Sequence, residues 1–411
     1  MSGAAASATA RPAAVAFVLV TVLLDVLAFG IVVPVLPKLI EAFQNGDTGR
    51  AAETYGVFAT AWALMQFVFS PVLGVLSDRF GRRRVLLVSL TGLGLDYVLM
   101  ALAPNLAWLF VGRVISGITA ATYSTATAYI ADVTPVEKRA ASFGYIGAVW
   151  GIGFIVGPAL GGVLGGIEPR LPFWAAAGLT LANSCYGFLV LPESLPREHR
   201  KPLTWRRANP LGALSLVRSK PGLAGLFAVH VLYTLAHFSL PAVFVLYASY
   251  RYGWSVREVG LTLALFGVFS ATTQGLIVGP AVRRIGERRA VLAGLAFGVA
   301  AYALYGLAPS GAWFLAAIPL GGLSGLYGAA LQALMTQRVQ MSEQGQLQGA
   351  NSSAMGLMGL VGPGLFTVVF ARAIGPGAVA GWQLPGAPFL VAAALTAAAF
   401  AIAVRAARPA S

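Results

Sequence analysis

The chain has 411 residues, of which 58% are hydrophobic and only 10% are charged. Soluble domains carry about 25% charged residues, so this composition excludes an ordinary soluble protein and indicates a polytopic membrane protein. The net charge of +14 would also suit a nucleic-acid-binding protein, but the positions of the charges argue against that class. The only cysteine, Cys185, excludes an intrachain disulfide and a thiolate metal cluster.

Twelve apolar stretches, most of them about 20 residues or longer, are predicted to cross a hydrocarbon core of about 30 Å as helices. We read the first as a retained span rather than a cleaved signal, because it is long and continues into further spans. The sequence therefore predicts an all-α polytopic membrane protein. The predicted spans are 13–35, 55–76, 85–103, 106–130, 140–166, 173–191, 223–247, 259–281, 290–308, 313–335, 348–370 and 389–404.

The chain repeats itself at a fixed offset. Gly74 and Gly279 lie 279 − 74 = 205 residues apart, and the same offset relates Gly81 to Gly286. Further pairs at this offset are Pro104 and Pro309, Trp108 and Trp313, and Pro158 and Pro363. One offset at several positions indicates an internal duplication. We expect a tail at 1–12, a six-helix half at 13–191, a linker at 192–221, and a second six-helix half with a short tail at 222–411.

The basic residues lie mainly on one side of the predicted membrane. Most of the 28 Lys and Arg residues fall in loops of that side, and Arg113 alone lies inside a span. Cytoplasmic loops carry the excess of Lys and Arg in membrane proteins. This distribution predicts that the linker and both termini face the cytoplasm. It also predicts that the positive charge contacts anionic lipid of a cell membrane rather than nucleic acid.

A short basic loop joins the second and third predicted spans. It reads Gly74-Val-Leu-Ser-Asp78-Arg79-Phe-Gly81-Arg82-Arg83-Arg84. Its two glycines permit a tight turn and a close approach of helices. Asp78 is the only anion among the cations, so it has several arginines to pair with and can lock one helix end to another.

Few charged residues lie inside the predicted spans. Each is a functional candidate, because a charge at the centre of a bilayer costs about 2.5–3.5 kcal/mol. Asp25 and Asp96 lie about 12 and about 11 residues into their spans, near the membrane midplane. Each is either a structural anion, which for Asp25 would pair with Arg113, or a carboxyl in a water-filled cavity that exchanges protons near neutral pH. Arg113 is either a permanent counter-ion or a substrate ligand.

The second half offers other polar candidates. Its spans contain no Asp or Glu, so proton movement is expected mainly in the first half. His230 occupies the position equivalent to Asp25, and His237 lies in the same span as His230. A role in helix packing is an open alternative for both histidines and for the uncharged residues. The uncharged candidates for lining a cavity are Gln66, Gln274, Gln332 and Asn351.

The fifth predicted span is rich in glycine, and small residues let helices approach closely in lipid. Pro158 removes a backbone hydrogen bond and should kink the helix. Composition leaves open whether this helix only packs tightly or also bends between the halves; the matching Gly362-Pro363 favours bending. The residues concerned are Gly144, Gly153, Gly157, Pro158, Gly161 and Gly162.

Motifs for catalysis are missing from the sequence. It contains no G-x-x-x-x-G-K-[ST] phosphate loop for ATP and no H-E-x-x-H zinc motif. Three histidines without cysteine partners make a poor metal site. We therefore expect neither an enzyme nor a metal centre. A receptor or scaffold that does not transport would share the helical pattern, but it would give no reason for paired carboxylates in mid-membrane.

The motifs together resemble those of the major facilitator superfamily. Residues 74–84 are similar to its signature loop between helices two and three, and Gly112-Arg113 with Gly117 resembles its proton-coupling motif. The glycines of the fifth span resemble the antiporter motif of the twelve-helix drug/proton exporters. Within that group the chain is most similar to tetracycline/proton antiporters. The segments that carry this likeness are Asp25 with 30–37, 63–66, Asp96-Tyr97, 128–132, 346–349 and 361–367.

The resemblance implies the major facilitator fold and the export of tetracycline-type drugs, as divalent-metal chelates, in exchange for protons. It implies a monomer in the inner or plasma membrane, without a resident cofactor. It places Asp78 and Arg82 at the cytoplasmic gate and Asp132 at the inner end of the fourth span. The cavity residues that it implies are Asp25, Gln66, Asp96 and Arg113. A multidrug or metabolite exporter of the same fold is the open alternative.

The chain departs from this family at two places. Ser270 stands in the eighth span where many members carry a histidine, and the ninth span lacks the aspartate that many members have in or near it. Both residues are tied to proton or substrate handling in the family. His230 and His237 are the candidates to replace them.

Overall fold

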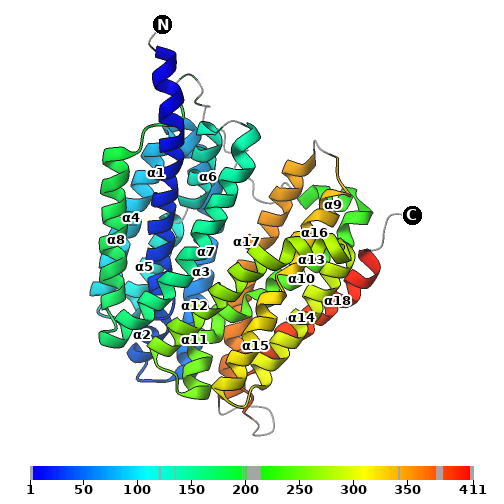
Figure 1. The fold of residues 1–411 in the computed structure, drawn as a ribbon. Coiled ribbons are helices and arrows are strands. Elements are labelled where there is room, and N and C mark those ends of the chain that lie inside the picture. The colour runs from blue at the N-terminus through cyan, green and yellow to red at the C-terminus, as the bar shows by residue number, and fades with distance from the viewer. Residues whose placement is uncertain are drawn as a thin grey trace. The chain divides into compact units, whose positions relative to one another are not determined.

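A computed structural model describes residues 3–119, 122–134, 136–196, 198, 200, 214–340, 343–375 and 383–407 (Figure 1). Almost all of these residues are helical, and none of those described forms a strand, so the all-α prediction is confirmed. The chain divides into two compact units. The first comprises Met1–Leu36 and Leu64–Asn209, and the second comprises Pro37–Ala63 and Pro210–Ser411.

The first unit is built from helices of the first half of the chain. Its buried core joins α1, α4, α6 and α7 through Val22, Leu86, Tyr129 and Ile146. The helices are α1 (Gly3–Val32), the inner part of α3 (Thr48–Phe80), α4 (Arg82–Leu102), α5 (Leu106–Thr119), α6 (Thr122–Val133), α7 (Val136–Ile167) and α8 (Leu171–Val190).

The second unit has a core of its own, in which Leu226, Leu295, Leu331 and Ala403 bring together α10, α14, α16 and α18. Its helices are α2 (Leu36–Phe43), the outer part of α3, α9 (Ser215–Ser219), α10 (Pro221–His237), α11 (Ser239–Tyr252), α12 (Val256–Thr272), the π-helical turn η4 (Thr273–Ile277), α13 (Val278–Ile285), α14 (Glu287–Leu307), α15 (Gly311–Leu323), α16 (Leu326–Thr336), α17 (Gln344–Ile374) and α18 (Ala387–Ala406).

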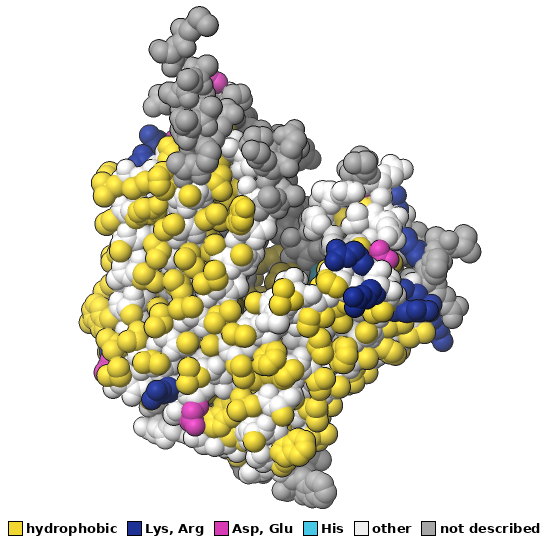
Figure 2. All heavy atoms as spheres, in the orientation of Figure 1, with side chains coloured by type: hydrophobic (Ala, Val, Ile, Leu, Met, Phe, Trp, Pro, Cys, Tyr) yellow, Lys and Arg dark blue, Asp and Glu magenta, His cyan; other side chains and the backbone are white. Residues whose placement is uncertain are grey.

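Eleven helical stretches within the described residues are long and apolar enough to cross a membrane. The remaining predicted span, the fourth, is described as α5 followed by α6, with residues 120–121 outside the described part. Figure 2 shows hydrophobic side chains covering the sides of the helices, with Lys and Arg gathered near helix ends. The prediction of a polytopic helical membrane protein is therefore confirmed.

The first, seventh and tenth predicted spans each correspond to one membrane-crossing stretch of the structure, but their helix bounds differ in detail. Helix α1 begins at Gly3, so it includes residues of the expected N-terminal tail. This stretch is rich in alanine, which has the highest helix propensity. The seventh span breaks at Phe238, because Pro241 has no N–H to donate to the His237 carbonyl. The tenth span breaks at Ser324, whose hydroxyl donates to the Gly321 carbonyl at 2.6 Å and so competes with the helix.

The boundary between the units also differs from the prediction, because residues 37–63 group with the second unit. In that unit the Tyr55 hydroxyl donates to the Pro241 carbonyl at 3.4 Å. A Cβ added to Gly56 would lie 2.0 Å from Oγ1 of Thr367 on α17. Glycine thus lets the N-terminal part of α3 lie directly against α17. The predicted halves are continuous stretches of sequence, so they could not include this contact.

The glycines of α7 pack against α1. A Cβ added to Gly153 would lie 2.4 Å from Val26 Cγ1, and one added to Gly161 would lie 2.1 Å from the Ile31 carbonyl oxygen. By contrast, an added Cβ at Gly144 would meet nothing within 4 Å. The helix continues through Pro158. Close packing in lipid therefore explains the glycines on one face of this helix.

We expect Gly161→Ala to destabilise the protein, because the new methyl group would meet backbone that cannot rotate away. Overpacking of this kind costs about 1–3 kcal/mol. Gly147→Ala on the same helix is the matched control, since its Cβ would meet nothing within 4 Å. Thermal unfolding of the two variants in detergent checks this prediction. Equal melting temperatures would contradict the packing role of Gly161.

Candidate functional site

Asp96 has the smallest exposed surface of the acids described in the first unit. It lies on α4 with 2% of its surface exposed, and both carboxylate oxygens are buried without a hydrogen-bond partner. A Cβ added to Gly112 on α5 would lie 2.9 Å from Asp96 Oδ1, so a glycine is needed there to make room for the carboxyl. Among the described residues, no hydrogen bond therefore satisfies this carboxyl, and the nearby charge of Arg113 is the interaction that it has.

Asp25, Tyr97 and Arg113 lie around the same place. Tyr97 is 2% exposed and interacts electrostatically with Asp25, Asp96 and Arg113. Arg113, on α5, is also buried and interacts electrostatically with Asp96. Side chains from α1, α4 and α5 thus form one group, which we call the acid cluster: Asp25, Asp96, Tyr97 and Arg113. Tyr97 was missed as a site residue, although it follows Asp96 directly in the sequence.

The proposed pairing of Asp25 with Arg113 is not seen. Asp25 forms no ion pair within the described residues, and its Oδ1 is buried without a hydrogen-bond partner. The charge of Arg113 acts instead on Asp96 and Tyr97. Gln66 is half-buried on α3 of the same unit. The arrangement leaves two carboxyls inside a helical bundle with groups that can exchange protons.

The basic loop after α3 holds an ion-pair network. Arg82 Nη1 contacts Asp78 Oδ1 at 2.6 Å, and its Nε contacts Asp132 Oδ2 at 3.1 Å. The Ser194 hydroxyl also donates to Asp132, at 3.1 Å. One guanidinium therefore ties together the end of α3, the start of α4 and the end of α6. The sequence singled out all three charged residues, and the structure brings them into contact.

Glu193 is a fourth charged residue at this network, and the sequence analysis missed it. Its Oε1 accepts the backbone N–H groups of Arg82 at 2.8 Å and Arg83 at 3.4 Å, so it caps the first turn of α4 from a distant part of the chain. Its Oε2 lies 3.8 Å from Arg200 Nη2. A carboxylate at a helix N-terminus is favoured by the helix dipole. Only the fold reveals this contact, since 111 residues separate Glu193 from Arg82.

The two glycines of the loop behave differently. Gly81 has φ of +103°, and an added Cβ would lie 2.2 Å from Glu193 Oε2. A side chain at this position would be strained and would displace the cap. Gly74 has open space around its Cα, so the close approach predicted there is not seen. Arg79 is exposed, with its guanidinium 5.4 Å from the Phe80 ring centroid.

The second unit brings three predicted residues together with a tyrosine. His230 Nδ1 and the Tyr327 hydroxyl are 3.1 Å apart, and Asn351 Nδ2 donates to Gln332 Oε1 at 2.8 Å. The Gln332 Nε2 and Asn351 Oδ1 atoms are buried without a hydrogen-bond partner. The His230 Nε2 atom is also buried without a hydrogen-bond partner, so this polar group, from α10, α16 and α17, has three unused polar atoms among the described residues.

The two remaining candidates of the second unit lie elsewhere. His237 is exposed at the end of α10, with its ring stacked 6.4 Å from that of Tyr233. Gln274 lies in the turn η4 and donates to the Ser270 hydroxyl at 3.1 Å. Within the described part of the chain, no three His, Cys, Asp or Glu side chains gather closely enough to hold a metal ion.

Comparison with known proteins identifies the family. The model of the Major Facilitator Superfamily matches residues 18–363 and 226–411. Tetracycline resistance protein, class C, of Escherichia coli is 40% identical over 375 residues, which cover 91% of this chain and 94% of that protein. The class G protein of Vibrio anguillarum is 40% identical over 358 residues, covering 86% of this chain and 89% of that protein.

Solved structures agree with this assignment. The human organic anion transporter MFSD10 (TETRAN) superposes with a TM-score of 0.69 at 26% identity, over 96% of this chain and 99% of that chain. The nucleoside transporter NupG, at 12% identity, shares the fold with a TM-score of 0.76 over 96% of this chain and 99% of that chain. The chain is therefore a transporter of the Major Facilitator Superfamily rather than an enzyme, and it belongs with the tetracycline resistance proteins.

Proposed function

We propose that this protein exports tetracycline-type drugs across the cytoplasmic membrane in exchange for protons. The acid cluster carries the proposal, because Asp25 and Asp96 are carboxyls with unpaired buried oxygens inside a transporter. Acids within membrane spans mark proton or substrate pathways. The relatives that are 40% identical are named for tetracycline resistance, which supports this drug class over other cargo.

The mechanism that we infer is alternating access, in which two repeats rock around a central site. When the site opens outward, Asp25 or Asp96 takes up a proton. When it opens inward, the proton leaves as the drug binds. Because neither carboxyl forms an ion pair with any described residue, each can change its protonation without breaking one. Arg113 supplies a fixed positive charge that interacts with Asp96 once the proton has left.

In this proposal the polar group of the second unit also contacts the drug. Gln332 Nε2 and Asn351 Oδ1 offer one donor and one acceptor to an uncharged part of the drug. A buried polar atom without a partner costs about 1–3 kcal/mol, so a ligand that fills both positions gains binding energy there. The protein holds no cofactor in this proposal; a divalent metal enters with the drug as a chelate. We further propose a monomer with both termini in the cytoplasm.

The test is uptake of tetracycline into inverted membrane vesicles that contain the full chain. We expect accumulation that depends on an imposed pH gradient and is abolished by a protonophore. No uptake of tetracycline by correctly inserted protein would reject this cargo. Growth of expressing cells on a panel of drugs separates the proposal from a multidrug or metabolite exporter. Such an exporter would give resistance to other compounds and not to tetracycline.

Asp25→Asn and Asp96→Asn should each reduce uptake to the level measured with the protonophore. An amide cannot exchange a proton, so coupling is lost while the shape of the side chain is kept. Asp47→Asn is the matched control, because Asp47 lies exposed in a loop where its carboxylate accepts the Arg50 N–H at 3.0 Å. Uptake that stays gradient-dependent in both cluster variants would show that the proton sites lie elsewhere.

Asp78→Asn should abolish transport without preventing membrane insertion. The amide loses the ion pair with Arg82 at 2.6 Å, which we expect to hold the cytoplasmic gate in one of its two states. Vesicle uptake and the amount of inserted protein are measured in parallel. Normal uptake by the variant would count against a gate role for Asp78.

Glu193→Ala should slow transport by about 2- to 5-fold, the effect of removing about 0.3–1 kcal/mol of charge stabilisation at a helix N-terminus. Glu193→Gln keeps an acceptor oxygen and should recover part of the rate. Glu168→Ala is the control, because Glu168 accepts the Arg170 N–H at 3.0 Å in a loop remote in sequence from the gate. If Glu168→Ala and Glu193→Ala reduced the transport rate equally, the cap formed by Glu193 would have no specific role in gating.

A further inference from the structure

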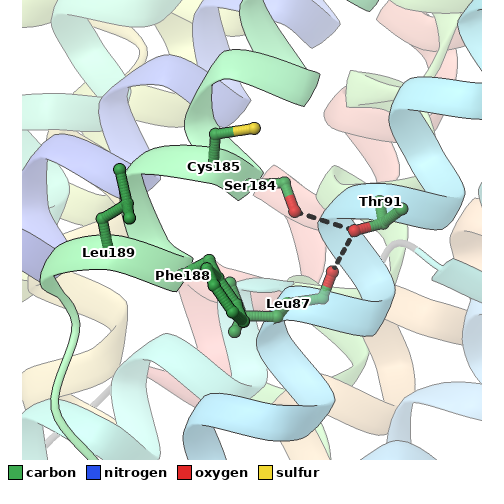
Figure 3. A pocket seen from close by; sticks show the side chains of 6 residues that line it. All are labelled: Leu87, Thr91, Ser184, Cys185, Phe188 and Leu189. Atoms are coloured by element: carbon green, nitrogen blue, oxygen red, sulfur yellow. Dashed lines mark hydrogen bonds between the residues drawn. The ribbon is translucent and has the colours of Figure 1, made fainter.

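A groove runs along the side of the first unit between α4 and α8 (Figure 3). Its volume is about 330 Å³, and much of its wall is apolar and exposed, with Phe188 64% and Leu189 80% accessible. At its floor the Thr91 and Ser184 hydroxyls are 2.7 Å apart, so these polar groups satisfy one another. The lining residues are Leu87, Thr91, Ser184, Cys185, Phe188 and Leu189.

The groove lies at the depth of one lipid leaflet. Helix α4 begins at Arg82, so Leu87 and Thr91 lie about 8 and about 14 Å along it, at 1.5 Å per residue. Helix α8 ends at Val190, next to the groove residue Leu189. Half of a hydrocarbon core of about 30 Å is about 15 Å thick. The groove therefore covers the acyl region on the side of the membrane where the arginines lie.

Arginines stand at the end of this groove. The Arg83 guanidinium lies 5.6 Å from the ring centroid of Phe188 and donates through Nη2 to the Phe188 carbonyl. Its Nε is buried without a hydrogen-bond partner. Arg84 follows it and is exposed. The neighbouring acid Glu193 is occupied by the backbone of α4 and by Arg200, so it does not neutralise these guanidinium groups directly.

We propose that this groove binds an anionic phospholipid, with an acyl chain against Phe188 and Leu189 and the headgroup phosphate at Arg83 and Arg84. The assignment to an anionic lipid rests on the cytoplasmic orientation included in the proposed function, because the cytoplasmic leaflet carries the anionic lipids. Apolar walls at acyl depth and positive charge at headgroup depth fit the two parts of one lipid molecule. A soluble phosphate would use only the arginines and would leave the apolar walls uncovered.

The test is native mass spectrometry of the full chain in detergent with added phosphatidylglycerol or phosphatidylcholine of identical acyl chains. We expect phosphatidylglycerol to bind more tightly. Arg83→Gln with Arg84→Gln should weaken its binding by about fivefold per arginine, since each contributes about 1 kcal/mol, and should leave phosphatidylcholine unchanged. Equal affinity of the wild-type chain for the two lipids would overturn the proposal.

The matched control is Arg288→Gln with Arg289→Gln, the equivalent pair of the second unit, in which Arg288 donates to the Val404 carbonyl at 3.3 Å. An equal loss in this control would show a general effect of charge and would also overturn the site. Cys185→Phe fills the groove without changing charge and should reduce retention of phosphatidylglycerol; unchanged retention would exclude the groove. These measurements need neither drug nor pH gradient, so their failure is distinct from failure of the proposed export.

Discussion

A bilayer offers no water to an isolated polar group, and this constraint governs the whole molecule. It requires helices, because each helix satisfies its own backbone. It also makes unpartnered carboxyls costly, by about 2.5–3.5 kcal/mol each at mid-membrane. Asp96, with both oxygens unpaired and a glycine opposite it on α5, is kept in spite of that cost. Such a residue contributes little to stability, so its place in the chain is explained by what it does when the site is hydrated.

The same constraint explains the chemistry of the inner membrane face. Arg82 could not hold two acids inside lipid without a large desolvation cost, but at a helix end it does so in contact with water. Glu193 adds a bond between the start of the linker and the first turn of α4. Arg82 of this loop closes an ion-pair network with Asp78 and Asp132, and in the proposed orientation and lipid site the neighbouring arginines face lipid headgroups.

The sequence predicts those features that depend on local pattern. Residue type and spacing predict the span lengths, the basic loop and the duplication. The contact of Arg82 with Asp78 is also local, because the two residues are four positions apart in the chain. It does not predict contacts that only the fold creates. Glu193 lies in an unremarkable polar linker, and the packing of Gly56 against Thr367 moves a whole segment into the second unit. The break at Phe238 has a visible cause in Pro241, but a single proline is also compatible with an unbroken span.

The duplication preserved the shell and let the two halves diverge in chemistry. Equivalent positions carry Asp25, which forms no ion pair among the described residues, and His230, which is hydrogen-bonded to Tyr327. Around them the first unit has two acids and an arginine, whereas the second has amides and tyrosines. Charged groups respond to protons, and amides respond to the shape and hydrogen bonding of a ligand. In the export that we propose, these two tasks are separate: the acid cluster of the first unit exchanges the protons, and the amides of the second unit contact an uncharged face of the drug. Coupling then requires only that both units move together when either one is occupied.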